Sequence, residues 1–153
     1  MDELDSAIIE ALQADGRRTN RDLAASLGVA PSTMLARVRS LHTRGLITGY
    51  HAVVDLTALG RPVQAMVTVR LRPQSRAVIH GFRDFVITLP ETVQVFITTG
   101  PDDLILHVAV PDTDALQDFV LDSLTKRKEV AGVRTEVIFD HRGNHAMTPG
   151  RRA

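Results

Sequence analysis

The sequence has 153 residues, and its 18 lysines and arginines balance its 18 aspartates and glutamates, so the formal net charge is zero. A chain of this length buries about 70% of its unfolded surface when it folds. It can therefore form one ordinary domain, or two small ones, without a disulfide bond or a metal ion to stabilise the fold. Cysteine is absent, which excludes disulfides, thiolate metal sites and thiol catalysis. No apolar run approaches the about 20 residues of a membrane span, and the start lacks a secretory signal, so we expect a cytoplasmic protein with no membrane partner.

The charges are unevenly distributed near the start of the chain. Acidic residues crowd the first 22 positions, whereas residues 23–54 contain none. The same acid-free stretch holds Arg37, Arg39 and Arg44. One interpretation is a chance gap in a neutral protein. The other is a positively charged surface for phosphate, which the neutral total conceals.

Residues 1–16 predict a first short helix. Leu4, Ile8 and Leu12 recur at helical spacing and form one apolar stripe. Asp2 is the expected cap, and Asp15-Gly16 is the expected end.

Two further helices are expected before residue 50. Thr19 is a predicted N-cap with Asp22 at the third helical position, and Gly28 suits the end of this second helix. Pro31 suits the first turn of a third helix that ends at Gly45. The side chains of the third helix that we expect to point inward are Met34, Leu35, Val38 and Leu41.

The second and third helices, joined by a tight glycine turn, match the helix-turn-helix pattern. Ala24 precedes Gly28 by four residues, and its small side chain permits close approach of the two helices. In this arrangement the third helix lies in the major groove of double-stranded DNA. A plain three-helix packing module is the alternative. The residues short enough to meet base edges are Ser32, Thr33, Ala36 and Ser40, and those expected to grip phosphates are Arg37, Arg39 and Arg44.

Residues 63–140 predict a second domain, after a hinge at 51–62. Alternating apolar residues indicate strands over 63–71, 93–99, 104–110 and 133–139, the last ending at Phe139. Helical spacing indicates helices over 78–89 and 112–124. The order is βαββαβ, the ferredoxin-like arrangement, so the fold class is α+β.

Such a sheet keeps both helices on one face and leaves the other face uncovered. That second face is expected to be partly apolar, which suits a dimer interface. Its apolar members are Met66, Phe96, Ile105, Ala109 and Ile138.

The remaining chain suggests no catalytic, cofactor or metal site. His141 and His145 are four residues apart, but Gly143 lies between them in a polar stretch, so a metal site is disfavoured. Residues 141–153 lack periodicity and predict a flexible tail, whose arginines include Arg151 and Arg152.

The whole pattern over residues 1–140 resembles the Lrp/AsnC, or feast/famine, family of prokaryotic transcription regulators. Each motif is weak alone, but their order and spacing are specific. The matching positions are Asp2, Asp5, Ile8, Ile9, Leu12, Asp15-Gly16-Arg17, Leu23-Ala24, Leu27-Gly28, Pro31-Ser32, Arg37-Val38, Leu41, Gly45, Ile47, Gly49-Tyr50, Gly100, Asp103 and Gly132-Val133.

The resemblance implies a sheet domain of the RAM type, which forms homodimers and often octamers and binds small effectors, commonly amino acids. It places the effector at the turn before the third strand, formed by Thr98, Thr99, Gly100, Pro101, Asp102, Asp103 and Leu104. Backbone N–H groups of such a turn suit a carboxylate, and Asp102 or Asp103 suits an ammonium group. A hairpin turn with no ligand is the alternative.

Two positions depart from the family. Ala30 stands where the family often has serine, so the third helix lacks a capping hydroxyl unless Ser32 or Thr33 supplies one or the helix starts at another residue. Asp102 and Leu104 stand where members often carry aromatic residues.

Three functions stay open at this point. The first is a nucleoid-associated transcription regulator tuned by a small effector. Some proteins of similar sequence are sirohaem decarboxylases, although the basic third helix and the scarcity of suitable histidines disfavour that reading. The third is an architectural DNA-binding protein that needs no effector.

Overall fold

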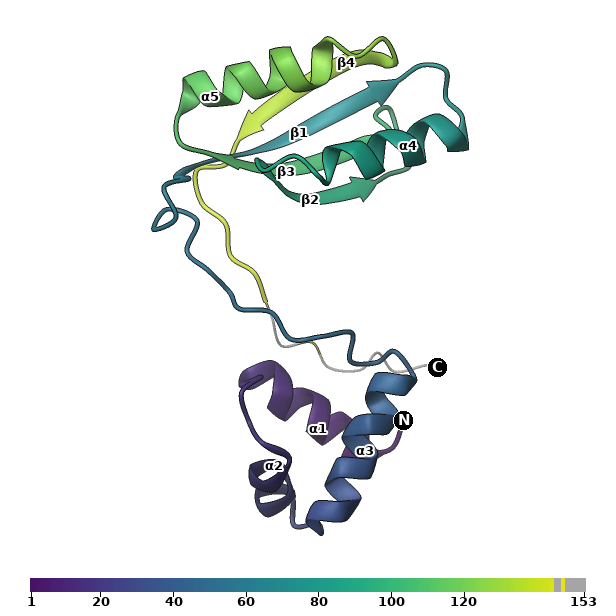
Figure 1. Cartoon of the computed structure of the whole chain (residues 1–153), viewed down its shortest axis with the longest axis vertical. Helices are drawn as coiled ribbons and strands as arrows, with labels where there is room; N and C mark the ends of the chain where they lie inside the picture. Colours follow the sequence, from purple (N-terminus) through teal and green to yellow (C-terminus); the bar gives the residue numbers. More distant parts are fainter. Residues whose placement is uncertain (145–146, 148–153) are drawn as a thin grey trace. The chain divides into compact units, whose positions relative to one another are not determined.

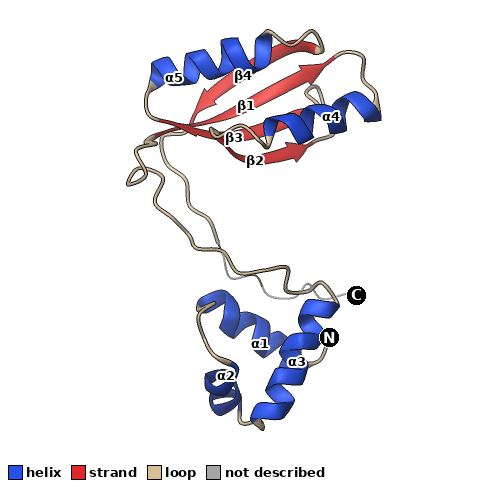
Figure 2. Ribbon diagram, viewed as in Figure 1, coloured by secondary structure: helices blue, strands red, loops and turns tan. Residues whose placement is uncertain are grey.

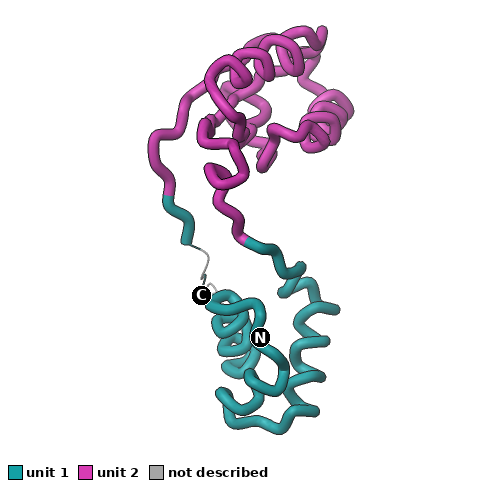
Figure 3. Tube along the Cα trace, turned by 60° about the vertical axis from the view of Figure 1, so that its left-hand side comes forward, with its two compact units in different colours: residues 1–52, 142–153 teal, residues 53–141 magenta. Residues whose placement is uncertain are grey.

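The computed structural model describes residues 1–144 and 147. Two compact units divide the chain (Figure 3). One holds residues 1–52 with the described residues from Arg142 on, and the other holds residues 53–141. No helix in the described part of the chain is long and apolar enough to cross a membrane.

Three helices form the first unit: α1 (Glu3–Ala14), α2 (Asn20–Leu27) and α3 (Pro31–Thr43). The predicted caps of the first two are confirmed. The side chain of Asp2 accepts a hydrogen bond from the Asp5 backbone N–H at 2.8 Å. Thr19 and Asp22 form a reciprocal capping box, which satisfies backbone donors that a helix start leaves free.

The three helices enclose a small apolar core. Ile8, Leu23, Met34 and Leu41 are completely buried there. Leu35, however, is 37% exposed, so its predicted inward position is wrong. The reason is geometric, since adjacent helical residues are about 100° apart and Met34 already points at the core.

The second unit is a four-stranded antiparallel sheet with helices (Figures 1 and 2). Its strands are β1 (Val63–Leu71), β2 (Thr92–Ile97), β3 (Leu104–Val110) and β4 (Val130–Val137), in the spatial order β2-β3-β1-β4. Its helices are α4 (Arg76–Val86) and α5 (Thr113–Asp118), and α5 continues as a π-helix, η1 (Phe119–Thr125). The βαββαβ order and the α+β fold class are confirmed.

One face of this sheet carries the core. The alternating residues of β1 from Ala65 to Leu71 are completely buried, as are Phe82 of α4 and Leu124 of η1. The predicted period of two in β1 therefore reflects burial on one side.

The other sheet face carries a mixture of apolar and polar residues. Cross-strand pairing places Met66 opposite His107, and Ile105 opposite both Thr68 and Phe96, so these residues share a face. Phe96 is 44% exposed. Phe139 does not belong to the fourth strand as predicted: β4 ends at Val137, and the Phe139 side chain is 99% exposed.

The predicted tail lies partly outside the described residues, which omit 145–146 and 148–153. His145, Arg151 and Arg152 fall in that part. Met147 is described, and its backbone N–H and carbonyl exchange two hydrogen bonds with the side-chain amide of Gln13, at 2.6 and 2.9 Å.

Candidate nucleic-acid interface and effector turn

The turn between α2 and α3 has the geometry that a helix-turn-helix requires. Gly28 has a φ of 68°, in the left-handed region that favours glycine. The backbone N–H of Val29 donates to the carbonyl of Ala24 at 3.1 Å, and Ala24 is 2% exposed. The small side chain of Ala24 is therefore buried in the core of this unit.

Helix α3 buries one face and exposes the opposite one. Met34, Val38 and Leu41 point into the core. The predicted base-contacting residues lie away from that core: Ser32, Thr33 and Ala36 are exposed, and Ser40 is half-buried. Their side chains are short and carry no charge.

The start of α3 lacks a side-chain cap. Its N-cap is Ala30, which forms no side-chain capping hydrogen bond, and Pro31 occupies the first turn. The missing hydroxyl expected from the sequence is therefore confirmed. Neither Ser32 nor Thr33 supplies a replacement capping bond in the described part of the chain.

Two of the three arginines assigned to phosphates are engaged inside the unit. Nη1 of Arg37 lies 2.6 Å from Asp2 Oδ2 and 3.2 Å from Asp5 Oδ1. Nη1 of Arg44 lies 2.9 Å from Asp5 Oδ2. Asp5 is 2% exposed, so this carboxylate is a buried link between α1 and the end of α3.

This Asp5 cluster, formed by Asp2, Asp5, Arg37 and Arg44, changes the electrostatics of α3. The hydrogen bond from the Asp5 backbone and the bond from Arg37 lower the pKa of Asp2. The hydrogen bond with Asp2 raises the pKa of Arg37, with a further contribution from Asp5. Two positive charges of the acid-free stretch are thus balanced by Asp2, the N-cap of α1, and by Asp5 within α1.

Arg39 differs from the other two predicted phosphate contacts. Within the described ranges its guanidinium forms no ion pair, and its side chain is exposed. Arg37 and Arg44 retain donors as well, because a guanidinium has five N–H groups and each uses only Nη1 in its ion pairs. The sequence pattern missed the cluster because its partners are 32 to 39 residues apart.

The predicted effector turn connects β2 to β3. Its ends are tied by hydrogen bonds from the Thr98 backbone N–H to the Asp103 carbonyl, and from the Thr98 hydroxyl to the Asp102 carbonyl, both at 3.0 Å. Gly100 has a φ of 147°, which other residues rarely adopt. In the described structure, no hydrogen bond uses the backbone N–H groups of Thr99, Gly100 or Asp102.

Both aspartates of the turn already have partners. Asp103 is 5% exposed; its Oδ2 accepts from the Leu71 backbone N–H and its Oδ1 from the Gln74 side chain, each at 2.7 Å. Asp102 Oδ2 lies 2.7 Å from Arg134 Nη2. Asp103 therefore secures the end of β1, next to the irregular pairing of β1 with β4 at Arg70 and Leu71.

The turn residues thus differ in what they offer a ligand. Leu104 is completely buried in the sheet core. Pro101 has no N–H, while Thr99 and Gly100 are exposed. Nowhere in the described part of the chain do three metal-binding side chains gather.

Comparison with known proteins matches both units. The AsnC-type helix-turn-helix domain matches residues 1–42, and the Lrp/AsnC ligand binding domain matches residues 64–145. The HTH-type transcriptional regulator AldR of Mycolicibacterium smegmatis is 40% identical over 141 residues, which cover 92% of this chain and 82% of that protein. The leucine-responsive regulatory protein of Rhizobium meliloti is 35% identical, covering 88% of this chain and 86% of that protein.

Solved structures agree. A transcriptional regulator from Neisseria meningitidis in complex with L-methionine superposes with a TM-score of 0.88 at 27% identity, covering 96% of both chains. AsnC of E. coli superposes with a TM-score of 0.85 at 26% identity, covering 97% of this chain and 99% of that one. These matches span both units, and the chain belongs to the Lrp/AsnC family of helix-turn-helix transcriptional regulators.

Proposed function

We propose that the chain regulates transcription by placing α3 in the major groove of DNA. The observation that carries the proposal is the exposed, acid-free face of α3 held by the Gly28 turn. Ser32, Thr33, Ala36 and Ser40 meet base edges, and Arg39 binds phosphate. Arg37 and Arg44 fix α3 against α1 through Asp5 and contribute their free donors to phosphate.

The chain acts as a homodimer in this proposal. The open sheet face carries Met66, Phe96 and Ile105, and an apolar surface of this kind suits burial against its own copy. A twofold dimer reads two half-sites that are about 34 Å apart or a multiple of it. Further association to an octamer, and action on the nucleoid in the cytoplasm, follow from the family resemblance.

In this proposal a small effector binds at the turn from Thr98 to Leu104. Amino acids are the first compounds to test. Three unengaged N–H groups in the turn suit the α-carboxylate. The Neisseria meningitidis relative in complex with L-methionine supports an amino acid as the ligand class. Asp103 is buried, so Asp102 is the better partner for an ammonium group. The Asp102 carboxylate would then interact with both the ammonium group and Arg134.

The DNA part is tested with Arg39→Ala. Loss of a phosphate contact weakens binding similarly at every DNA sequence. It also reduces the slope of the logarithm of the binding constant against the logarithm of the salt concentration by roughly one, because about one counterion fewer is released. Fluorescence anisotropy on an operator and on random DNA measures both. The matched control is Arg76→Ala on α4, which changes an arginine far from α3 in sequence. An Arg39→Ala protein that changes only its base preference contradicts the assigned role.

Two other functions give different results. A sirohaem-decarboxylase-like enzyme converts a tetrapyrrole substrate and does not bind DNA. A ligand that binds only the folded state must raise the midpoint of thermal unfolding. An architectural protein without an effector therefore binds DNA, but no amino acid raises its midpoint of thermal unfolding.

A further inference from the structure

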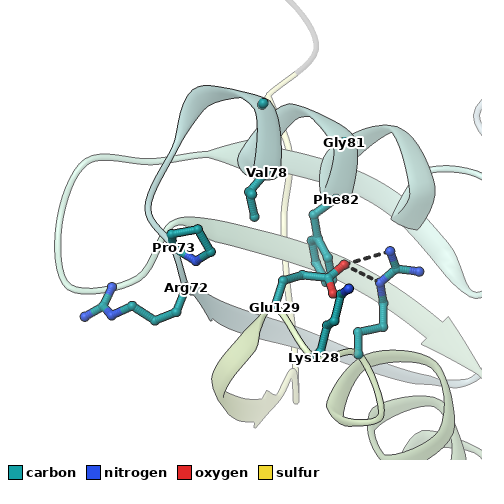
Figure 4. A pocket seen from close by; sticks show the side chains of 9 residues that line it. Arg72, Pro73, Val78, Gly81, Phe82, Lys128 and Glu129 are labelled. Atoms are coloured by element: carbon teal, nitrogen blue, oxygen red, sulfur yellow. Dashed lines mark hydrogen bonds and ion pairs between the residues drawn. The ribbon is translucent and has the colours of Figure 1, made fainter.

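A pocket of about 540 Å³ lies where β1 ends and β4 begins. Three segments line it: the connection after β1, one face of α4, and the connection before β4 (Figure 4). The turn from Thr98 to Leu104 contributes no residue to its lining, so the pocket is distinct from the proposed effector turn.

The apolar part of the pocket comes mainly from α4 and Pro73. Phe82 is 1% exposed and Val78 is half-buried. Figure 4 shows both projecting from α4 on the side of Pro73 and Glu129. These groups offer contact to a ligand with an apolar body.

Gly81 keeps the α4 side of the pocket open. A glycine inside a helix is less favourable than alanine because it costs more backbone entropy. A Cβ at Gly81 would meet no atom within 4 Å, so close packing against another segment of the chain does not explain it. Its position in the lining makes the missing side chain part of the pocket's shape.

The charged part of the lining is positive. Arg72, Arg127 and Lys128 face a single acid, Glu129. Arg127 is committed, since its Nη2 lies 2.7 Å from Glu129 and its guanidinium carbon lies 4.0 Å from the centre of the Phe85 ring.

Lys128 is the cation available to a ligand. Neither it nor Arg72 forms an ion pair within the residues that the structure describes, but Figure 4 shows the Arg72 guanidinium pointing away from the other lining side chains. The Lys128 ammonium group therefore lies beside the apolar lining without an ion pair of its own among the described residues, since Glu129, the acid that its charge acts on, is already bound by Arg127.

We propose that this pocket binds a small organic carboxylate that has an apolar body and no ammonium group. Lys128 binds the carboxylate, and Phe82, Val78 and Pro73 contact the body. The excess of positive charge disfavours an amino acid, whose ammonium group would lie near Lys128 and Arg127. The chain then has two ligand sites of different chemistry, one at the turn and one at this pocket.

Isothermal titration of the full-length chain with 4-methylpentanoate tests the proposal. The carboxylate is expected to bind, while leucine and the neutral amide 4-methylpentanamide are expected to bind this pocket at least about tenfold more weakly. Lys128→Gln is expected to weaken carboxylate binding about tenfold.

The matched control is Lys126→Gln, because Lys126 lies two residues away, outside the lining, and pairs with Asp122. It is expected to leave binding unchanged. Gly81→Leu fills the pocket from another segment and is expected to abolish binding. Equal affinities for Lys128→Gln and Lys126→Gln, equal binding of acid and amide, or no binding of the acid overturns the proposal. Each of these results leaves DNA binding by α3 untouched, so the two proposals fail separately.

Discussion

Asp5 links the two helices that matter most for the proposed DNA contact. Its carboxylate is 2% exposed and receives Arg37 on one oxygen and Arg44 on the other. A buried charge is tolerated only when its lone pairs are satisfied, and the two arginines do this. The recognition helix is therefore fixed on α1 by charge as well as by its apolar face.

Asp5→Asn is expected to lower the free energy of unfolding by about 1 to 2 kcal/mol, because a buried acceptor of charged bonds is lost while both arginines remain partly hydrated. Urea unfolding at neutral pH measures the change. Asp2→Asn is the control, since asparagine caps as well as aspartate and the lost pair is exposed. It is expected to have the smaller effect, and an equal or larger one would contradict the account.

His107 gives the sheet unit a dependence on pH. Burial lowers its pKa from 6.5, and the neighbouring His141 lowers it further. The folded state thus favours the neutral ring, and the unfolded chain binds the proton more tightly. The stability from this group is complete above 6.5 and is lost as the pH falls through the lowered pKa of the folded state.

His107→Gln is therefore expected to flatten the stability profile between neutral pH and about pH 5. Urea midpoints measured across that range check it. His80→Gln, on the exposed side of α4, is the control and keeps the wild-type slope. An unchanged slope in His107→Gln rules out this origin of the pH dependence.

At the scale of the element, the N-terminus of α3 differs from those of α1 and α2. Asp2 and Thr19 cap their helices with side-chain oxygens, whereas Ala30 has none. Its backbone already has the extended conformation of a capping residue, with φ of −65° and ψ of 143°. A serine at this position needs no rearrangement for its hydroxyl oxygen to accept a hydrogen bond from a backbone N–H of the first turn.

Ala30→Ser is expected to raise the free energy of unfolding by about 1 kcal/mol. Thermal unfolding measures the gain, and Ala25→Ser on the exposed side of α2, away from any cap, is the control and is expected to give no gain. A lower midpoint for Ala30→Ser would show that the start of α3 is not limited by its missing cap.

The elements were predictable from the sequence wherever the signal is local. Caps such as Thr19 with Asp22, the Gly28 turn and the alternation in β1 depend on neighbours a few residues away. The Asp5 cluster and the role of Asp103 at the end of β1 join residues about 30 apart, so no local pattern contains them. Helical spacing likewise did not reveal that α5 continues as a π-helix.

At the scale of the whole molecule, the neutral total conceals how the charges pair. In the first unit, Asp2 and Asp5 balance Arg37 and Arg44, which leaves Arg39 as the unpaired cation of the predicted phosphate contacts, among the residues described. One such helix carries few phosphate contacts, so nonspecific affinity is expected to be modest. In the proposed homodimer, specific binding then depends on two recognition helices that bind DNA together.

The measurement that tests the central claim most directly is recovery of genomic DNA bound by the chain, with and without a mixture of amino acids. The account predicts a discrete set of sites with paired half-sites, and occupancy that changes when amino acids are added. The account also predicts that the affinity for these sites falls steeply as the salt concentration rises, because phosphate contacts release counterions. Uniform or absent recovery contradicts the recognition role of α3, and discrete sites that ignore every amino acid contradict the effector turn.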